Sequence, residues 1–205
     1  NDSGLRLRLG EFGLVATQAG TSIAYMRTDV APGLKKPADI MNTGGFTVAG
    51  LGAMSSLDIR ERLVLDMLGV TYGYGTGYRR TSKARTAVAY GEVHYLSEYE
   101  PSFRARVLPA LVETGVAIPL FYYPYDDGTT LRDWPDVARG LNILPFHEFY
   151  QKVKGRKPSG MLWKAFRQVN RAAGMVQRAI LLPPKSPQAA LASRRKAVVG
   201  LNRDP

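Results

Sequence analysis

The fold is decided by residues 44–100, which read GGFTVAGLGAMSSLD at 44–58, VTYGYGTGY at 70–78 and GEVHY at 91–95. Each of the three runs contains a short segment rich in β-branched or aromatic residues, which predicts a strand. Between the runs, apolar residues recur at helical spacing. The stretch therefore predicts the order strand, glycine-rich loop, helix, strand, helix, strand.

Strands that alternate with helices in this way form parallel β-α-β units. The remainder of the chain continues the pattern, with strands predicted at 12–19, 23–27, 116–123 and 179–182. In parallel sheets, ligands bind beyond the carboxyl ends of the strands. We therefore expect an α/β protein whose binding site is built from the loops at 50–56, 76–82 and 96–101.

The composition is that of a globular chain, with 205 residues, of which 45% are hydrophobic and 22% charged. The formal net charge of +11 permits nucleic acid, an anionic surface or a small anion as partner. No zinc-finger, RRM-type or other nucleic-acid signature accompanies the basic residues, so nucleic-acid binding is the minor alternative. The absence of cysteine excludes disulfides, cysteine nucleophiles and thiolate metal sites. No uninterrupted apolar run approaches the length of a membrane span.

The loop from Gly50 to Ser56 has a definite chemical use. Its glycines and small residues let backbone N–H groups point at a ligand, and Ser55 and Ser56 add hydroxyl donors. The helix that follows adds partial positive charge at its N-terminus. Such a loop can hold a carboxylate or a phosphate. The alternative is an ordinary capped turn between a strand and a helix. The residues alone favour the anion-binding loop and the capped turn equally.

Other residues that carry chemistry are sparse. The two histidines, His94 and His147, lack paired metal-ligand spacing and are expected to be structural. Glu92, Glu98 and Glu100 form an acidic cluster that could do acid–base work, but no companion nucleophile is visible. We interpret the cluster as a polar lip that orders water or accepts a substrate hydroxyl.

The run GVTYGYGTGY at 69–78, followed by ARTAVAYGEV at 84–93, resembles the periplasmic solute receptors of tripartite tricarboxylate transporters, the Bug-type binding proteins. Further similar segments lie at 50–52, 137–149 and 181–187. The resemblance spans about residues 12 to 203, and the order of the motifs is the stronger argument. The acidic residue that the family carries after Gly-Glu-Val is replaced here by His94 and Tyr95.

This resemblance implies a type II periplasmic binding protein-like α/β fold, with two lobes and a ligand cleft between them. One lobe is expected at 29–118. The other lobe, built from 1–28 and 119–205, is expected to be incomplete, because the family's first strand and first glycine-rich ligand loop would lie upstream and its final helices are cut short. Closure is expected as a hinge motion about crossings near 27–29 and 118–120.

For function, the resemblance implies a monomeric periplasmic receptor that captures a small carboxylate for membrane transporter subunits. No cofactor, metal, nucleic acid or catalysis is expected. The expected ligand-binding residues are Gly50, Gly52, Ala53, Met54, Ser55, Ser56, Tyr78, Arg79, Ser97, Glu98 and Tyr99. Two alternatives stay open: an enzyme of the same fold class with Glu98 or His94 as base, and a regulatory or nucleic-acid-associated domain that uses the positive charge.

Overall fold

The computed structural model describes residues 8–175 and 177–201, and the chain divides into two compact units. Unit 1 comprises Asn1–Ala19 and Met175–Pro205, and unit 2 comprises Gly20–Gly174. Unit 2 extends on both sides beyond the lobe expected at 29–118, because the flanking segments pack into the same core. The two lobe boundaries that the resemblance implies stay a prediction.

Unit 2 is built on a six-stranded mixed sheet with the strand order β4-β3-β5-β2-β6-β9. In chain order the strands are β2 (Ser22–Arg27), β3 (Phe46–Gly50), β4 (Tyr72–Thr76), β5 (Tyr95–Tyr99), β6 (Ala117–Tyr122) and β9 (Leu144–Pro145). β3 pairs in parallel with β4 and β5, and β6 pairs in parallel with β9. β2 runs antiparallel to both of its neighbours, β5 and β6. The predicted parallel series is confirmed for β3, β4 and β5, whereas a fully buried apolar strand such as β2 looks the same in sequence whichever way it runs.

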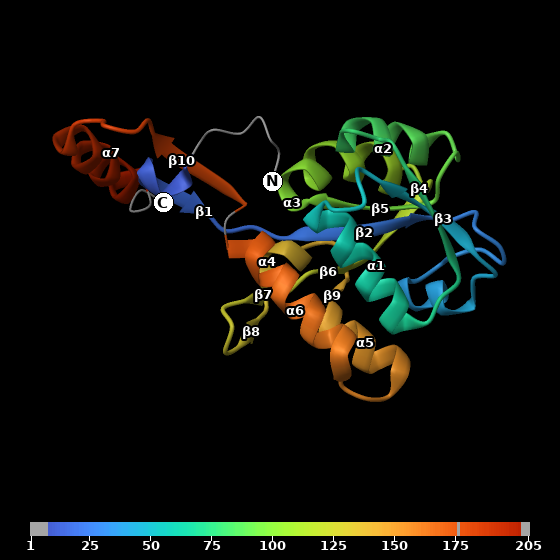
Figure 1. Ribbon diagram of the computed structural model, residues 1–205. Coiled ribbons are helices and arrows are strands. Elements are labelled where there is room, and N and C mark those ends of the chain that lie inside the picture. Colours follow the sequence, from blue (N-terminus) through green and yellow to red (C-terminus); the bar gives the residue numbers. More distant parts are fainter. Residues whose placement is uncertain (1–7, 176, 202–205) are drawn as a thin grey trace. The chain divides into compact units, whose positions relative to one another are not determined.

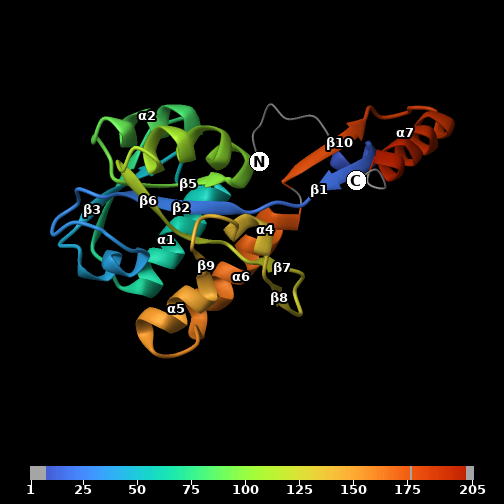
Figure 2. The same cartoon turned by 180° about the vertical axis from the view of Figure 1, so that it is seen from behind.

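Helices cover both faces of this sheet (Figures 1 and 2). On one face lie α1 (Ser56–Leu68), α5 (Phe146–Lys154) and α6 (Gly160–Met175), and on the other lie α2 (Thr81–Ala89) and the π-helix η3 (Phe103–Val112). Successive strand residues point to opposite faces. Tyr95 of β5 therefore enters the core under α1 and α5, and Leu96 enters the core under α2 and η3.

Short elements complete unit 2, namely η2 (Pro37–Asn42), α3 (Glu100–Ser102), α4 (Pro135–Ala138), β7 (Tyr125–Asp126) and β8 (Leu131–Arg132). Helix α1 has well-defined ends because its sequence supplies both caps. The Ser55 side chain accepts a hydrogen bond from the N–H of Asp58, and Gly69 ends the helix in the left-handed conformation with φ of 65°.

Unit 1 contains η1 (Leu9–Glu11), an antiparallel ribbon of β1 (Gly13–Gln18) and β10 (Arg178–Leu182), and α7 (Gln188–Leu201). Helix α7 packs on β1, where the Arg195 guanidinium donates to the carbonyl oxygen of Leu14 at 2.7 and 2.9 Å. No helix within residues 8–175 and 177–201 has both the length and the hydrophobicity to cross a membrane.

One sequence-based expectation needs correction. The strand expected at 92–96 begins three residues later, as β5, because a turn and bend at 90–92 follow α2 and residues 93 and 94 have no regular structure. The hinge positions expected at 27–29 and 118–120 stay a prediction; both segments lie inside unit 2, where β2 and β6 pair with each other. The chain passes between the two units at 19–20 and at 174–175.

Candidate functional site

The candidate site lies at the sheet edge where the parallel strands of unit 2 end. There β3 leads into α1, β4 into α2, β5 into α3 and β9 into α5. Because the strands are parallel, their carboxyl ends meet at one edge. The N-termini of longer helices such as α1, α2 and α5 contribute partial positive charge at this edge. The arrangement suits an anionic ligand group.

The loop between β3 and α1 is organised by the fully buried carboxylate of Asp58. Its Oδ2 accepts from the N–H of Gly52 at 2.9 Å and from the hydroxyl of Tyr74 at 2.5 Å, and its Oδ1 accepts from the hydroxyl of Ser55 at 2.9 Å. Gly52 and Ser55, both expected to face a ligand, thus bind an acceptor that the chain itself supplies.

Gly50 serves the same arrangement. A Cβ atom at this position would lie 2.6 Å from the Tyr74 hydroxyl, so only glycine admits the Tyr74 ring that reaches Asp58. The carbonyl oxygen of Gly50 accepts from the N–H of Tyr78 at 3.3 Å. This bond brings the loop after β3 beside the loop after β4, as is expected of neighbouring parallel strands.

The exposed part of the loop comprises Ala53, Met54 and Ser56. Within the described part of the chain, no atom accepts a hydrogen bond from the N–H groups of these three residues or of Leu57. The Arg62 guanidinium holds the loop in place by donating to the carbonyl oxygen of Ala53 at 2.8 Å. The loop therefore offers several unpaired backbone donors at the start of α1.

Tyr78 and Arg79 lie at the end of β4. The Tyr78 hydroxyl donates to Glu92 Oε1 at 2.6 Å, and this bond raises the pKa of Tyr78 to about 12. Arg79 is exposed and forms no ion pair with any described residue. Glu92 is thus occupied by Tyr78, whereas the Arg79 guanidinium is available to an anion.

Glu98 is buried inside unit 2 and does not form the polar lip expected from the sequence. Its side chain is 0% exposed and receives two hydrogen bonds from Arg85, at 2.8 and 2.9 Å. The hydroxyls of Tyr25 and Ser102 donate to the same carboxylate at 3.0 and 2.7 Å. The carboxylate is therefore fully satisfied within the protein and stabilises the packing of α2 against β5.

Ser97 and Tyr99 flank Glu98 on β5. The Ser97 hydroxyl is buried against the Tyr123 hydroxyl at 3.0 Å, on the opposite face of the sheet from Glu98. Tyr99 lies against Gly20, where an added Cβ would meet the Tyr99 ring at 2.2 Å. Of the three expected contacts from β5, Tyr99 alone is partly exposed at the strand end.

Two buried charged residues of α1, Arg60 and Glu61, were not singled out from the sequence. Arg60 is 3% exposed and forms no ion pair with a described residue. It donates to Ser56 O and Asn170 Oδ1, both at 3.3 Å, and its guanidinium carbon lies 4.7 Å from the centroid of the Tyr123 ring. Burial lowers the pKa of Arg60. In sequence the two charges looked like the polar face of an amphipathic helix, so no signal pointed to them.

Glu61 terminates the pairing between β3 and β5. Its Oε1 accepts from the backbone N–H of Ser97 at 2.5 Å, and its buried Oε2 has no partner among the described residues. Burial, followed by the nearby charge of Asp58, raises the pKa of Glu61 well above its usual range. Arg60 and Glu61 thus place a buried cation and a buried acid of raised pKa in the first turns of α1, and Arg60 contacts the candidate loop at Ser56.

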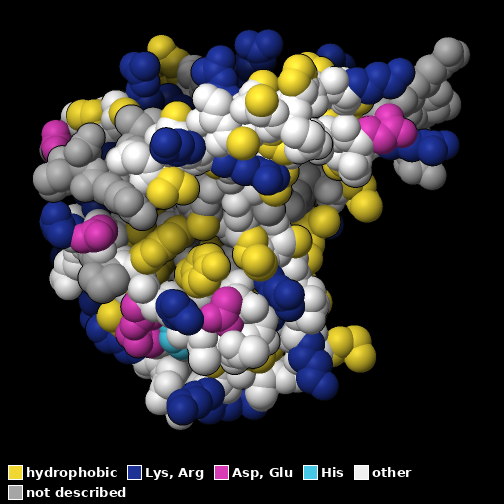
Figure 3. Space-filling view, turned by 90° about the vertical axis from the view of Figure 1, so that its left-hand side faces the viewer, with side chains coloured by type: hydrophobic (Ala, Val, Ile, Leu, Met, Phe, Trp, Pro, Cys, Tyr) yellow, Lys and Arg dark blue, Asp and Glu magenta, His cyan; other side chains and the backbone are white. Residues whose placement is uncertain are grey.

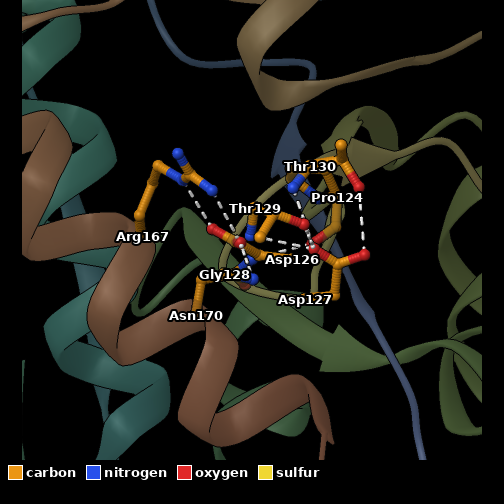
Figure 4. A network of polar contacts seen from close by, with 8 residues as sticks. All are labelled: Pro124, Asp126, Asp127, Gly128, Thr129, Thr130, Arg167 and Asn170. Atoms are coloured by element: carbon orange, nitrogen blue, oxygen red, sulfur yellow. Dashed lines mark hydrogen bonds and ion pairs between the residues drawn. The ribbon is translucent and has the colours of Figure 1, made fainter.

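The segment after β6, expected as a loop, is tied to α6 by the network drawn in Figure 4. Arg167 donates to both oxygens of Asp126, at 2.7 and 2.8 Å, and the Asn170 amide donates to the carbonyl oxygen of Pro124 at 2.7 Å. Asp127 caps the turn by accepting from the N–H groups of Thr129 and Thr130, which lowers its pKa. The network fixes a connection that follows one of the parallel strands.

The two residues considered as catalytic bases, His94 and Glu98, have structural partners. His94 Nδ1 accepts from the N–H of Thr47 at 3.1 Å, which agrees with the structural role expected for it. Glu98 is held by Arg85 as described above. His147 is half-buried with its Nδ1 unpartnered among the described residues, and burial lowers its pKa.

Lys and Arg side chains are scattered over the face of the molecule shown in Figure 3, where hydrophobic and uncharged side chains separate them. Nucleic-acid binding calls for a basic patch or stripe. This face presents separate basic groups instead.

No family model matches the chain, and no curated protein matches it. Solved structures do. A periplasmic transporter structure matches with a TM-score of 0.57 and 14% identity, over 95% of this chain and 55% of its own length. MatC from Rhodopseudomonas palustris with bound malate matches with a TM-score of 0.53 and 16% identity, over 99% of this chain and 60% of its own. The R. palustris protein Rpa4515 with adipate matches with a TM-score of 0.51 and 14% identity, over 92% of this chain and 67% of its own.

The chain has the fold of a periplasmic binding protein. The expected type II periplasmic binding protein-like α/β class is thereby confirmed, from matches whose low sequence identity speaks for the fold alone. The chain spans 55% to 67% of the length of these structures.

Proposed function

We propose that this chain forms part of a periplasmic solute-binding protein that captures a small carboxylate for a tripartite tricarboxylate-type transporter. The observation that carries the proposal is the group of unpaired backbone donors at the start of α1, namely the N–H groups of Ala53, Met54, Ser56 and Leu57. Helix N-termini bind carboxylates through such groups together with the helix dipole. The similar folds with malate and adipate support a ligand of this class.

The residues beneath and beside the loop favour an anion. Arg60 is a buried cation without a carboxylate partner among the described residues, and Arg79 adds an exposed cation at the end of β4. Electrostatic attraction in a partly buried site exceeds that at an open surface. Asp58 opposes it, but its carboxylate already accepts hydrogen bonds from three donors of the chain. A dicarboxylate whose one end meets Ala53–Met54 fits this charge distribution.

The other expected contacts divide into two groups. Tyr78, Arg79 and Tyr99 stay proposed as ligand contacts, because each is at least partly exposed at a strand end. Gly50, Gly52, Ser55, Ser97 and Glu98 act in the proposal as the scaffold that shapes the loop, because internal partners or neighbours occupy them. The protein would act as a monomer, without a cofactor and without turnover, and hand its solute to membrane subunits.

The proposal is tested by thermal unfolding of the chain in a panel of carboxylates that includes malate and adipate. Binding to the native state alone raises stability by about 2.7 kcal/mol at one hundred times Kd. Saturable stabilisation without turnover of the compound is the expected result. Conversion of the carboxylate would favour the enzyme alternative, and a salt-dependent shift of DNA would favour the nucleic-acid alternative.

The donor loop is tested by replacing Ser56, the first residue of α1, with proline. Proline is favoured at this helix position and removes only an N–H that the helix does not use. Ser55, with φ of −68° and ψ of 138°, already has the extended backbone that precedes proline. We expect Ser56→Pro to weaken carboxylate binding about tenfold, by the worth of one charge-assisted hydrogen bond. Ser56→Ala keeps the N–H and is the matched control, so equal losses in both variants would count against backbone recognition.

A further inference from the structure

Unit 2 contains a pocket of about 410 Å³ beside β9, the edge strand of its sheet. Three elements surround it: η2, the segment that leads into β9, and α5. Its apolar wall consists of the partly exposed residues Pro37, Ala38 and Leu144, and the buried residues Leu120, Ile143 and Phe149 also line it. A pocket of this volume is large enough for a small organic ligand.

Two lysines flank the apolar wall. Lys36 precedes η2, Lys152 lies on α5, and both are exposed lining residues of the pocket. Neither forms an ion pair with a described residue, and no aspartate or glutamate lines the pocket. The nearby carboxylate of Asp39 is held by the backbone N–H groups of Lys35 and Lys36, at 2.8 and 3.0 Å. The pocket thus has a net positive rim.

The pocket exists because the sheet's edge strand is short. β9 pairs with β6 only at Phe121 and Tyr122, so β6 residues before Phe121 have no strand on that side. Leu120 directly precedes the paired segment of β6, and it lines the pocket together with Asn142. Asn142 has a φ of 50°, which turns the chain around the pocket mouth before β9 begins.

This pocket is separate from the candidate carboxylate site. It is lined by the start of η2, by the segment that leads into and begins β9, by Leu120 of β6 and by Phe149 and Lys152 of α5, whereas the carboxylate site is built from the loops after β3 and β4 and the end of β5. The two sites share no residue. They also differ in chemistry, because the carboxylate site is made of backbone donors and the pocket is made of apolar side chains with two ammonium groups at its rim.

We propose that this pocket binds an amphiphilic monocarboxylate, with the apolar chain against Pro37, Ala38 and Leu144 and the carboxylate between Lys36 and Lys152. A small inorganic anion would pair with the lysines but leave the apolar wall in water. A neutral apolar compound would cover the wall, but it would displace water from the two ammonium groups and offer them no hydrogen-bond acceptor in return. One anionic group on an apolar chain satisfies both parts of the pocket.

Calorimetric titration of the chain with straight-chain carboxylates from butyrate to decanoate tests the proposal. Each added CH₂ that enters the pocket is expected to lower Kd about fourfold until the pocket is full. Octanoate is expected to bind equally well with and without saturating malate. Absence of a chain-length trend, or displacement of octanoate by malate, would overturn the assignment of a separate amphiphile site.

Two variants locate the binding. Lys36→Glu combined with Lys152→Glu is expected to weaken octanoate binding at least tenfold, because two attractive charges become repulsive. The control, Lys35→Glu combined with Lys157→Glu, changes the net charge equally at exposed positions outside the pocket. Equal losses in both double variants would show general charge attraction and refute the proposal.

A third variant, Ala38→Trp, fills the pocket without changing its charge. It is expected to abolish octanoate binding while its melting temperature stays near that of the parent chain, because Ala38 is partly exposed. Retained binding in this variant would place the ligand elsewhere. Sedimentation tests whether a second copy of the chain occupies the pocket. If the parent chain forms a dimer, and octanoate or Ala38→Trp dissociates it, the pocket belongs to the dimer interface and the proposal is overturned.

Discussion

Replacing Arg85 by methionine leaves the buried carboxylate of Glu98 without its counter-ion. Arg85 supplies two of the four hydrogen bonds that Glu98 accepts, at 2.8 and 2.9 Å, and the Glu98 side chain is 0% exposed. Removing one partner of a buried ion pair typically destabilises a protein by about 3 to 5 kcal/mol. Because the hydroxyls of Tyr25 and Ser102 still donate to Glu98, we expect the lower end, about 3 kcal/mol.

The assay is urea unfolding of the chain at neutral pH, with Glu98→Gln and the double variant completing a cycle. Glu98→Gln should destabilise the protein less than Arg85→Met. It leaves the Arg85 guanidinium without a counter-ion, but the Arg85 side chain is 20% exposed and can be hydrated. The double variant should recover about 1 to 2 kcal/mol relative to the sum of the single variants. An Arg85→Met loss below about 1 kcal/mol, or strict additivity in the cycle, would refute the view that Glu98 is held inside the lobe by Arg85.

The same cycle separates a structural Glu98 from a ligand contact. A structural Glu98 predicts that Glu98→Gln, assayed well below its melting temperature, binds carboxylates as tightly as the parent chain. A ligand contact predicts a change in affinity without the coupling to Arg85.

Two further predictions concern the neighbouring loop. Burial raises the pKa of Glu61 above its ordinary value of 4.5, so its contribution to stability is complete below that pH and declines as the pH rises towards the pKa of the folded state. Glu61→Gln should remove a decline of up to about 1.4 kcal/mol per pH unit, measured by urea unfolding from pH 4 to 8 against the exposed control Glu113→Gln. Gly50→Ala should cost about 1 to 3 kcal/mol, because its Cβ would lie 2.6 Å from the Tyr74 hydroxyl, whereas Gly52→Ala meets no atom within 4 Å and should cost little; equal melting temperatures for the two variants would contradict this.

Much of the architecture of unit 2 follows from local patterns. The alternation of short apolar runs with helical spacing predicted β3, α1, β4 and α2 near their observed bounds, because each element carries its own start and stop signals. Ser55 and Gly69 are such signals for α1. The ends of β3 and β4 were therefore placed correctly relative to one another, and with them the loops at 50–56 and 76–82, whereas the loop expected at 96–101 falls largely within β5.

Side-chain direction could not be read in the same way. The difference of three residues in the bounds of β5 decides whether Glu98 belongs to a loop or to a strand of the sheet. With the strand expected at 92–96, Glu98 fell in a loop and looked like a lip residue. In the structure it is the fourth residue of β5 and meets Arg85 of α2, a pairing that no local pattern encodes.

The loop between β3 and α1 shows why a cradle and a capped turn looked equally good in sequence. A helix N-terminus recognises a carboxylate by the same backbone donors whether the carboxylate belongs to a ligand or to the chain. Here Asp58 takes the N–H of Gly52 and the hydroxyl of Ser55, which accounts for the capped turn. It leaves the N–H groups of the exposed residues Ala53 and Met54 unpaired among the described residues. The two interpretations therefore describe adjacent halves of one loop: the inner carboxylate fixes the backbone that would present the outer donors to a solute.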